Sequence, residues 1–262
     1  MKYKFLLIIV IPFVFFVSCE KDKTYEQGKY MFEGQQLFNV IPNAVCDVDG
    51  NSYDAVKIGE QIWMKQNLRT THYSDGTSIT LGNSGTTSSI TGYRYIPNEQ
   101  STLVSQYGYL YNWKAVMRNA SSSNANPSGV QGICPTGWHV PSDAEWTQLT
   151  DYVSSQSQYV CGSTSTYIAK SLASTTGWAS TSTNPCAVGN TPSSNNATGF
   201  SALPAGYYNG SYSNFGLNAY FWSSTEGNST GAYRRYLFYS NAGVDWGCSY
   251  KSTAVSVRCL RD

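Results

Sequence analysis

Cysteine, histidine, two tryptophans and a helix-start signal lie together in the segment CPTGWHVPSDAEW, residues 134–146. Such a density is typical of either an active site or a structural anchor. A catalytic interpretation would make His139 a general base and Cys134 its nucleophile. Cys134, however, follows an apolar residue, precedes a proline and has no basic neighbour to lower the pKa of its thiol. The only other histidine, His72, lies in a polar stretch, so we expect structural or surface roles for both and no histidine metal site.

The acidic residues offer two further candidate sites. The run from Asp47 to Asp54 resembles a calcium loop, but its glycine stands at the fourth position and no Glu stands at the twelfth. A hairpin turn explains this run better. Glu226 and Asp245 could flank a sugar, yet two scattered acids are more often solvated. Since no phosphate loop or nucleophile elbow occurs, we expect no catalytic residue, metal or cofactor.

A binding surface is indicated by residues 206–250, where Tyr, Asn, Ser and Gly dominate. This is the composition of antibody paratopes, in which Tyr supplies rigid contact area and the small polar residues supply adaptable hydrogen bonds. Strand alternation lets only one of two adjacent residues point inward, and exposed aromatics need a reason. We expect the outward residues to form one contiguous ligand-binding surface: Tyr208, Tyr212, Asn214, Phe215, Asn218, Tyr239, Asn241, Asp245, Trp246 and Tyr250. We expect Trp222, Leu203, Val257 and Trp146 to be buried instead.

The elements that must position these residues are mostly short strands. Residues 45–68 alternate apolar and polar around two turn signals, which predicts a meander of three strands. Residues 74–98 are rich in Gly, Ser and Thr and predict loops. After Gly177 the chain reads as strand and loop to its end.

Two helices interrupt the strands. Ser142 and Glu145 form a capping box, which predicts a helix of about three turns starting at Asp143. A second helix is expected over residues 166–173. Helices framed by strands from both halves of the chain predict one α+β domain, residues 44–262, with mostly antiparallel strands and both chain ends in one sheet.

The first residues determine the compartment. Lys2 and Lys4 precede an apolar run, residues 5–17, that is too short to span a bilayer comfortably. A small residue then precedes Cys19. This predicts a signal peptide over residues 1–18 and resembles a bacterial lipobox, in which Cys19 becomes the lipidated N-terminus.

Phe16 departs from the Leu that is usual in a lipobox, and the alternative is an ordinary secretory signal with an incidental cysteine. Glu20 and Asp22 resemble the surface-export signal of Bacteroidetes lipoproteins. We therefore expect residues 19–43 to be a tether that holds the domain at the outer membrane, facing the cell exterior. With 17 basic and 16 acidic residues, the chain has no charged face for nucleic acid.

The remaining six cysteines form an even set in an oxidising compartment, so disulfides are expected. Six cysteines allow fifteen pairings, and spacing alone does not choose among them.

Several blocks of the chain resemble one family. DVDGNSYDAVKIGEQIWMKQNLRTTHYSDG, YGYLYNWKAV, CPTGWHVPSDAEWTQL, TGFSALPAGYY, FWSSTE, YRRYLFYS and SVRCLRD are similar, in the same order, to the blocks of the Fibrobacter succinogenes major paralogous (FISUMP) domain family. The resemblance covers about residues 45–262. It implies a secreted or surface lipoprotein.

A more distant likeness implies a fold. WHVPSDAEW and SVRCLRD are similar to the helix start and closing strand of C-type-lectin domains of the formylglycine-generating-enzyme type. By that analogy Cys134 pairs with Cys259. We also expect Cys161 and Cys186 to pair and close a local loop, which leaves Cys46 and Cys248. The segment 134–146 is then an anchor.

The departures limit what that likeness implies. Cys248 and Cys259 are too far apart to match the closely spaced pair that the enzyme uses for copper and oxygen chemistry, and the calcium-binding motifs of C-type lectins are absent. The terminal run also resembles the variable region of retroelement-diversified proteins of this fold.

Together these observations predict a monomeric, non-enzymatic surface lipoprotein that binds a protein or glycan through its C-terminal surface. The alternatives are an enzyme related to sulfatase-modifying factors and a structural, fimbria-associated component.

Overall fold

The structure is a computed structural model that describes residues 40–262. The signal peptide, Cys19 and most of the expected tether lie outside the described residues. Residues 40–43, at the end of the expected tether, are part of the first strand: β1 (Val40–Cys46) pairs with β2 (Ser52–Ile58) on both sides of an irregularity between Ile41 and Val45. No helix of the described part is long and apolar enough to cross a membrane.

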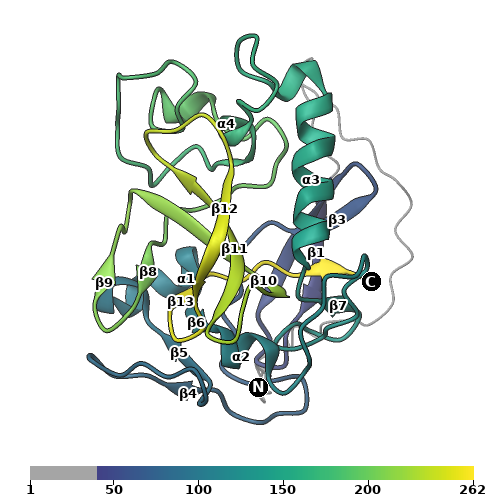
Figure 1. The fold of residues 1–262 in the computed structure, drawn as a ribbon, viewed down its shortest axis with the longest axis vertical. Coiled ribbons are helices and arrows are strands. Elements are labelled where there is room, and N and C mark those ends of the chain that lie inside the picture. The colour runs from purple at the N-terminus through teal and green to yellow at the C-terminus, as the bar shows by residue number, and fades with distance from the viewer. Residues whose placement is uncertain (1–39) are drawn as a thin grey trace, which may run out of the picture.

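Both ends of the described chain meet in one five-stranded sheet (Figure 1). β1, β2 and β3 (Gln61–Met64) form the expected antiparallel meander. The final strand β14 (Leu260–Arg261) then lies between β3 and β7 (Trp138–His139). The prediction that the two ends share a sheet is confirmed.

The second sheet has three antiparallel strands from the C-terminal run: β10 (Asn218–Glu226), β11 (Gly231–Phe238) and β12 (Asp245–Tyr250). The third sheet is built from six short strands in the order β4 (Thr80–Leu81), β5 (Tyr93–Tyr95), β6 (Leu110–Asn112), β13 (Ala254–Val255), β8 (Tyr207–Tyr208) and β9 (Tyr212–Ser213). Of the strand pairs described, only β4 with β5 is parallel. The strands β4 and β5 fall in the stretch that we expected to be loops.

The main helix is α3 (Asp143–Ser155), which begins at the predicted capping box: the Ser142 hydroxyl accepts from the Glu145 backbone N–H, and the Glu145 side chain accepts from Ser142 N–H. The second predicted helix is shorter than expected. α4 spans only Ala169–Leu172, because Tyr167 closes a turn onto Thr164 before it and Ala173 pairs with Ala202 after it.

The other helices are single turns that the pattern did not predict. They are α1 (Val104–Tyr107), α2 (Trp113–Met117) and 3-10 turns at Pro97–Glu99, Ser101–Leu103, Ser157–Tyr159 and Pro192–Ser194. The structure is therefore an α+β domain with one long helix.

Aromatic residues fill the core. Trp146 on α3 packs against Trp63 of β3, with 4.5 Å between the ring centroids, and against Phe221 of β10 at 5.6 Å. Trp222, Val257 and Trp146 are buried as expected, whereas Leu203 is only half-buried. α3 thus joins the first sheet to the second.

The segment 134–146 is a structural anchor. Cys134 and Cys259 form a disulfide, as do Cys161 and Cys186, so both implied pairs are confirmed. Cys248 is an exposed free thiol. His139 is buried between two acids: its Nδ1 lies 2.6 Å from Asp262 Oδ1, and its Nε2 lies 2.8 Å from Glu145 Oε1. Through His139, these contacts connect Asp262 to Glu145 in the first turn of α3.

The two acids around His139 predict that the free energy of unfolding decreases as the pH rises. Burial alone lowers its pKa, but the hydrogen bonds and charges of Glu145 and Asp262 outweigh this effect and raise the pKa above its usual 6.5. A raised pKa means that the charged imidazole stabilises the fold fully below about pH 6.5 and that this contribution is lost as pH rises through the folded-state pKa. The contribution is about 1.4 kcal/mol for each pH unit by which the pKa is raised.

We expect the free energy of unfolding, measured by urea titration, to decrease between pH 5.5 and pH 8. Asp262→Asn removes one of the two acids and should flatten this decrease, whereas the neighbouring Arg261→Gln should leave it unchanged. A wild-type stability that rises over this interval would contradict the assignment.

Candidate functional site

The register of the second sheet sorts its side chains onto two faces. Phe221, Arg235 and Trp246 lie directly opposite one another on β10, β11 and β12, and so do Trp222, Arg234 and Gly247. Because successive residues of a strand point to opposite faces, these two rows lie on opposite sides of the sheet. The adjacent arginines Arg234 and Arg235 therefore have different surroundings.

The face that carries Arg235 packs on α3. The Arg235 guanidinium forms an ion pair with Asp143, at 2.9 Å, and donates to the hydroxyl of Thr147 and the backbone oxygen of Asp143. This pairing fixes the helix on β10 and β11. β12 is the edge strand of the sheet, and its side chains on this face are far more exposed.

Three exposed residues of β12 and the half-buried Tyr233 of β11 form what we call the outer aromatic row, defined as Tyr233, Trp246, Cys248 and Tyr250. Trp246 is 61% exposed and Tyr250 is 67% exposed. Trp246 rests on Tyr233, with 5.7 Å between the ring centroids, and the Arg235 guanidinium lies 5.9 Å from its ring. The indole therefore contacts Tyr233 and Arg235 while most of its surface is exposed to solvent.

The opposite face holds a second group, the Arg234 cluster, defined as Tyr207, Tyr220, Arg234 and Tyr236. The Arg234 guanidinium lies over the ring of Tyr220, at 4.4 Å, and within 6 Å of the rings of Tyr207 and Tyr236. Burial lowers the pKa of Arg234. Its Nε and Nη1 atoms are buried and have no hydrogen-bond partner.

Amide side chains border this cluster. The Nδ2 atoms of Asn214 and Asn218 both donate to the hydroxyl oxygen of Tyr220, at 3.2 and 2.8 Å. Asp245 of β12 lies opposite Tyr236, and its charge contributes to raising the pKa of that phenol, after the larger effect of burial. Tyrosine, asparagine, aspartate and arginine thus meet on one face.

The ten nominated residues do not form one contiguous surface, which corrects that prediction. Trp246 and Tyr250 lie on the face toward α3, whereas Asn218 and Asp245 lie on the face of Arg234. Asn218 is also buried, as is Tyr208, which stacks on Tyr95 at 4.2 Å in the third sheet. These two residues do not face outward.

The other nominated residues are divided between the core and separate parts of the surface. Tyr212 and Phe215 are half-buried in the hydrophobic cluster of the third sheet, and Tyr239 is half-buried against the cluster beneath α3. Asn214 is half-buried beside Tyr220. Asn241 is exposed and donates to Asp245 at 3.3 Å.

Arg234, Tyr207, Tyr220 and Tyr236 were not among the residues predicted from the sequence. Alternation along AYRRYLFYS carries a usable signal, because it places Arg234 and Tyr236 on one face and Arg235 on the other.

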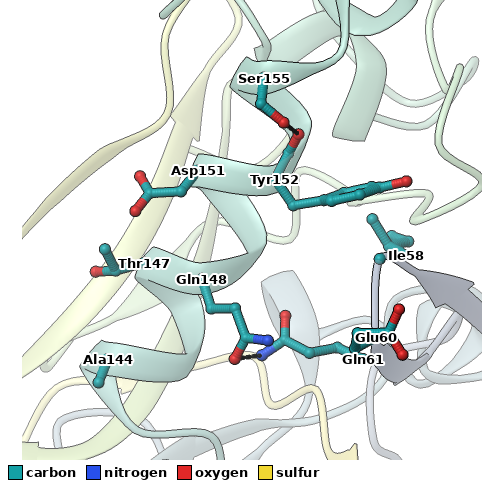
Figure 2. Close-up of a pocket in the computed structure, with 10 residues that line it drawn as sticks. Ile58, Glu60, Gln61, Ala144, Thr147, Gln148, Asp151, Tyr152 and Ser155 are labelled. Carbon is teal, nitrogen blue, oxygen red and sulfur yellow. Dashed lines mark hydrogen bonds between the residues drawn. The ribbon is translucent and has the colours of Figure 1, made fainter.

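A groove of about 520 Å³ lies between α3 and the turn that joins β2 to β3 (Figure 2). Figure 2 shows Gln148 of α3 meeting Gln61 across its lower end, where the Gln61 Nε2 donates to the Gln148 Oε1 at 3.3 Å. The ring of Tyr152 covers Gly59, where an added Cβ would lie 3.0 Å from the ring. The groove contains none of the nominated residues.

A smaller pocket, of about 380 Å³, is lined by Asp49, Arg69 and Tyr109 among others. The Asp49 Oδ1 lies 2.5 Å from the Nδ1 of His72, a contact between residues 23 apart that we did not predict from the sequence. Burial alone would raise the pKa of Asp49, but hydrogen bonds from Thr71, His72 and Thr70 together outweigh this effect and hold the pKa below its usual range. This side chain is therefore already satisfied by its neighbours.

The turn after β1 has the hairpin character that we expected. The Asp47 carboxylate accepts from the backbone N–H groups of Asp49 and Asn51 and from the Tyr53 hydroxyl, so its oxygens shape the turn. In the described part of the chain, no three His, Cys, Asp or Glu side chains gather as metal ligands.

Comparison with known proteins identifies one family. Neither the curated proteins nor the solved structures contain a match to the chain. The family model of the Fibrobacter succinogenes major domain (Fib_succ_major) matches residues 56–261. The chain therefore belongs to the Fibrobacter succinogenes major domain family.

Proposed function

We propose that this protein is a lipid-anchored surface lipoprotein that binds a protein or glycan ligand through its C-terminal sheet, with the outer aromatic row as the contact surface. The observation that carries the proposal is the exposure of Trp246 and Tyr250 on an edge strand. Large apolar side chains that are grouped on a surface often mark an interaction site. Trp and Tyr are also among the residues that contribute most to the binding energy of interfaces.

Two features of the row support this use. Trp246 packs against Tyr233 and lies near Arg235, and such contacts reduce the conformational entropy that its side chain loses on binding. As an edge strand, β12 also offers backbone groups that an extended segment of a partner can pair with.

We also propose the cellular location and the lipid anchor that the sequence predicts. Cys19 carries the lipid, residues 1–18 are a signal peptide, and the domain is displayed from the outer membrane as a monomer without a cofactor. The α+β architecture, the long helix against the C-terminal sheet and the disulfide from Cys134 to the closing strand support a C-type-lectin-like fold. The resemblance of the terminal run to retroelement-diversified regions is in keeping with a binding surface.

A catalytic role has less support. Enzymes of the formylglycine-generating type use a closely spaced pair of reactive cysteines near the C-terminus. In this chain Cys259 forms a disulfide with Cys134. Cys248 is a free, exposed thiol two residues from Trp246 on β12, so it has no cysteine partner for such a pair in the described residues.

Removal of either exposed ring should weaken ligand binding without unfolding the domain. We expect Trp246→Ala and Tyr250→Ala each to weaken binding by about 5- to 150-fold, equivalent to roughly 1–3 kcal/mol, because each ring is an interface anchor. The mature protein is to be screened on a glycan array and against surface proteins of neighbouring cells, and the dissociation constant of the hit compared between variants by interferometry.

Tyr152→Ala is the matched control, since Tyr152 is a partly exposed aromatic on α3, in the groove of Figure 2. It should bind as the wild type does. If Trp246→Ala and Tyr250→Ala bind like the control, or if both lose the folded state, the outer aromatic row is not the contact surface.

A further inference from the structure

Arg234 differs from every other arginine that lies over an aromatic ring in residues 40–262. Five such arginines donate to a nearby oxygen: Arg69 to Asn51 and Ser52, Arg94 to Ile79, Arg118 to Asp75, Arg235 to Asp143 and Thr147, and Arg258 to four acceptors. Arg234 has the same kind of ring contact, yet its Nε and Nη1 have no acceptor. Buried donors are almost always paired, so this exception requires an explanation.

The packing shows where an acceptor could come from. Gly247 lies opposite Arg234 on β12, so no side chain covers the guanidinium from that strand. Tyr207 and Tyr236 are both half-buried, so two of the rings beside the guanidinium lie at the surface of the domain. The acceptor that the cluster lacks can therefore arrive with a ligand.

We propose that the Arg234 cluster is a binding site for a carboxylated sugar. A guanidinium presents a planar fork of donors that matches a carboxylate, and desolvation by the surrounding rings strengthens that pairing. The half-buried rings of Tyr207 and Tyr236 offer flat apolar surfaces to a pyranose ring, and the half-buried side chain of Asn214 supplies a polar group for its hydroxyls. A carboxylate on a flexible peptide would use the fork but not the rings.

This site is separate from the outer aromatic row, because Arg234 and Trp246 lie on opposite faces of the sheet. It does not depend on the proposed function of that row. Substitutions in one group can therefore be tested with the other intact.

The test follows the Arg234 Nε–H resonance of the mature wild-type protein by NMR. The probes are sialyllactose and trigalacturonate, with lactose and trigalactose as uncharged counterparts and tetraglutamate as an acidic peptide. We expect at least one carboxylated sugar to shift the resonance at millimolar concentration while the uncharged sugars do not. In Arg234→Met the dissociation constant for that sugar should rise at least tenfold.

Arg118→Met is the matched control, since Arg118 also lies over a tyrosine, at 4.9 Å from Tyr73, but already pairs with Asp75. It should bind the sugar as the wild type does, and so should Trp246→Ala. The proposal is wrong if neither carboxylated sugar shifts the Arg234 resonance. It is also wrong if tetraglutamate shifts the resonance as strongly as the sugar, since the rings would then contribute nothing.

Discussion

Replacing Arg258 with Met is expected to destabilise the domain by about 3 kcal/mol or more, because each buried acceptor that loses its donor costs about 1–3 kcal/mol. Arg258 is fully buried, and its guanidinium donates to Asn67 Oδ1 at 2.7 Å and to the backbone oxygens of Met64, Phe200 and Ser201 at 3.0, 2.6 and 2.8 Å. It also lies over the ring of Phe200. Methionine would fill much of the volume but would leave these acceptors unpaired.

The free energy of unfolding from urea titrations, followed by circular dichroism, measures this effect. Arg261→Met is the control, because Arg261 is exposed on the neighbouring strand β14. A loss of less than about 1 kcal/mol for Arg258→Met, within the range of an ordinary surface substitution, would show that the network is not needed for the fold.

The second large effect concerns the disulfide between Cys134 and Cys259. It closes a loop of 125 residues, whereas the disulfide between Cys161 and Cys186 closes one of 25. In the chain-entropy model these loops contribute about 5 and about 3.5 kcal/mol, because the longer cross-link removes more freedom from the unfolded chain. We expect the double Ser variant of the first pair to lose more stability than the double Ser variant of the second.

Thermal unfolding of the two double variants, scanned at the same pH and protein concentration, provides the comparison. Peptide mapping of the wild-type protein without reduction should recover both pairs. If removal of the 25-residue loop costs more, or if mapping joins Cys134 to another cysteine, this explanation of the anchor fails.

The elements that could be predicted are those with local signals. The capping box of Ser142 and Glu145 fixed the first residue of α3, because its hydrogen bonds join residues only three apart. The turns at Asp49-Gly50 and Gly59-Glu60 likewise set the meander of β1 to β3. α2 escaped prediction because aromatic residues before it continue a strand-like pattern, while Asn112, its cap, ends β6 in the same residue.

The site was less predictable because its contacts are long-range. Tyr208 and Tyr212 look equally fit for a binding surface, yet Tyr208 is buried against Tyr95, more than a hundred residues away in the chain. Arg234 and Arg235 are neighbours of the same type, and only the position of α3 gives Arg235 its carboxylate partner. Composition indicated that the C-terminal run holds exposed aromatics, but it did not determine which face each residue joins.

Photo-cross-linking from position 250 tests the central claim, that the outer aromatic row contacts the ligand, most directly. Benzoylphenylalanine replaces Tyr250 in one variant. In a control it replaces Tyr152 of α3, which is less exposed than Tyr250. Cells that display each variant are irradiated with the ligand, and the adducts are identified by mass spectrometry. We predict an adduct from position 250 and none from position 152; adducts from position 152 alone would contradict the account.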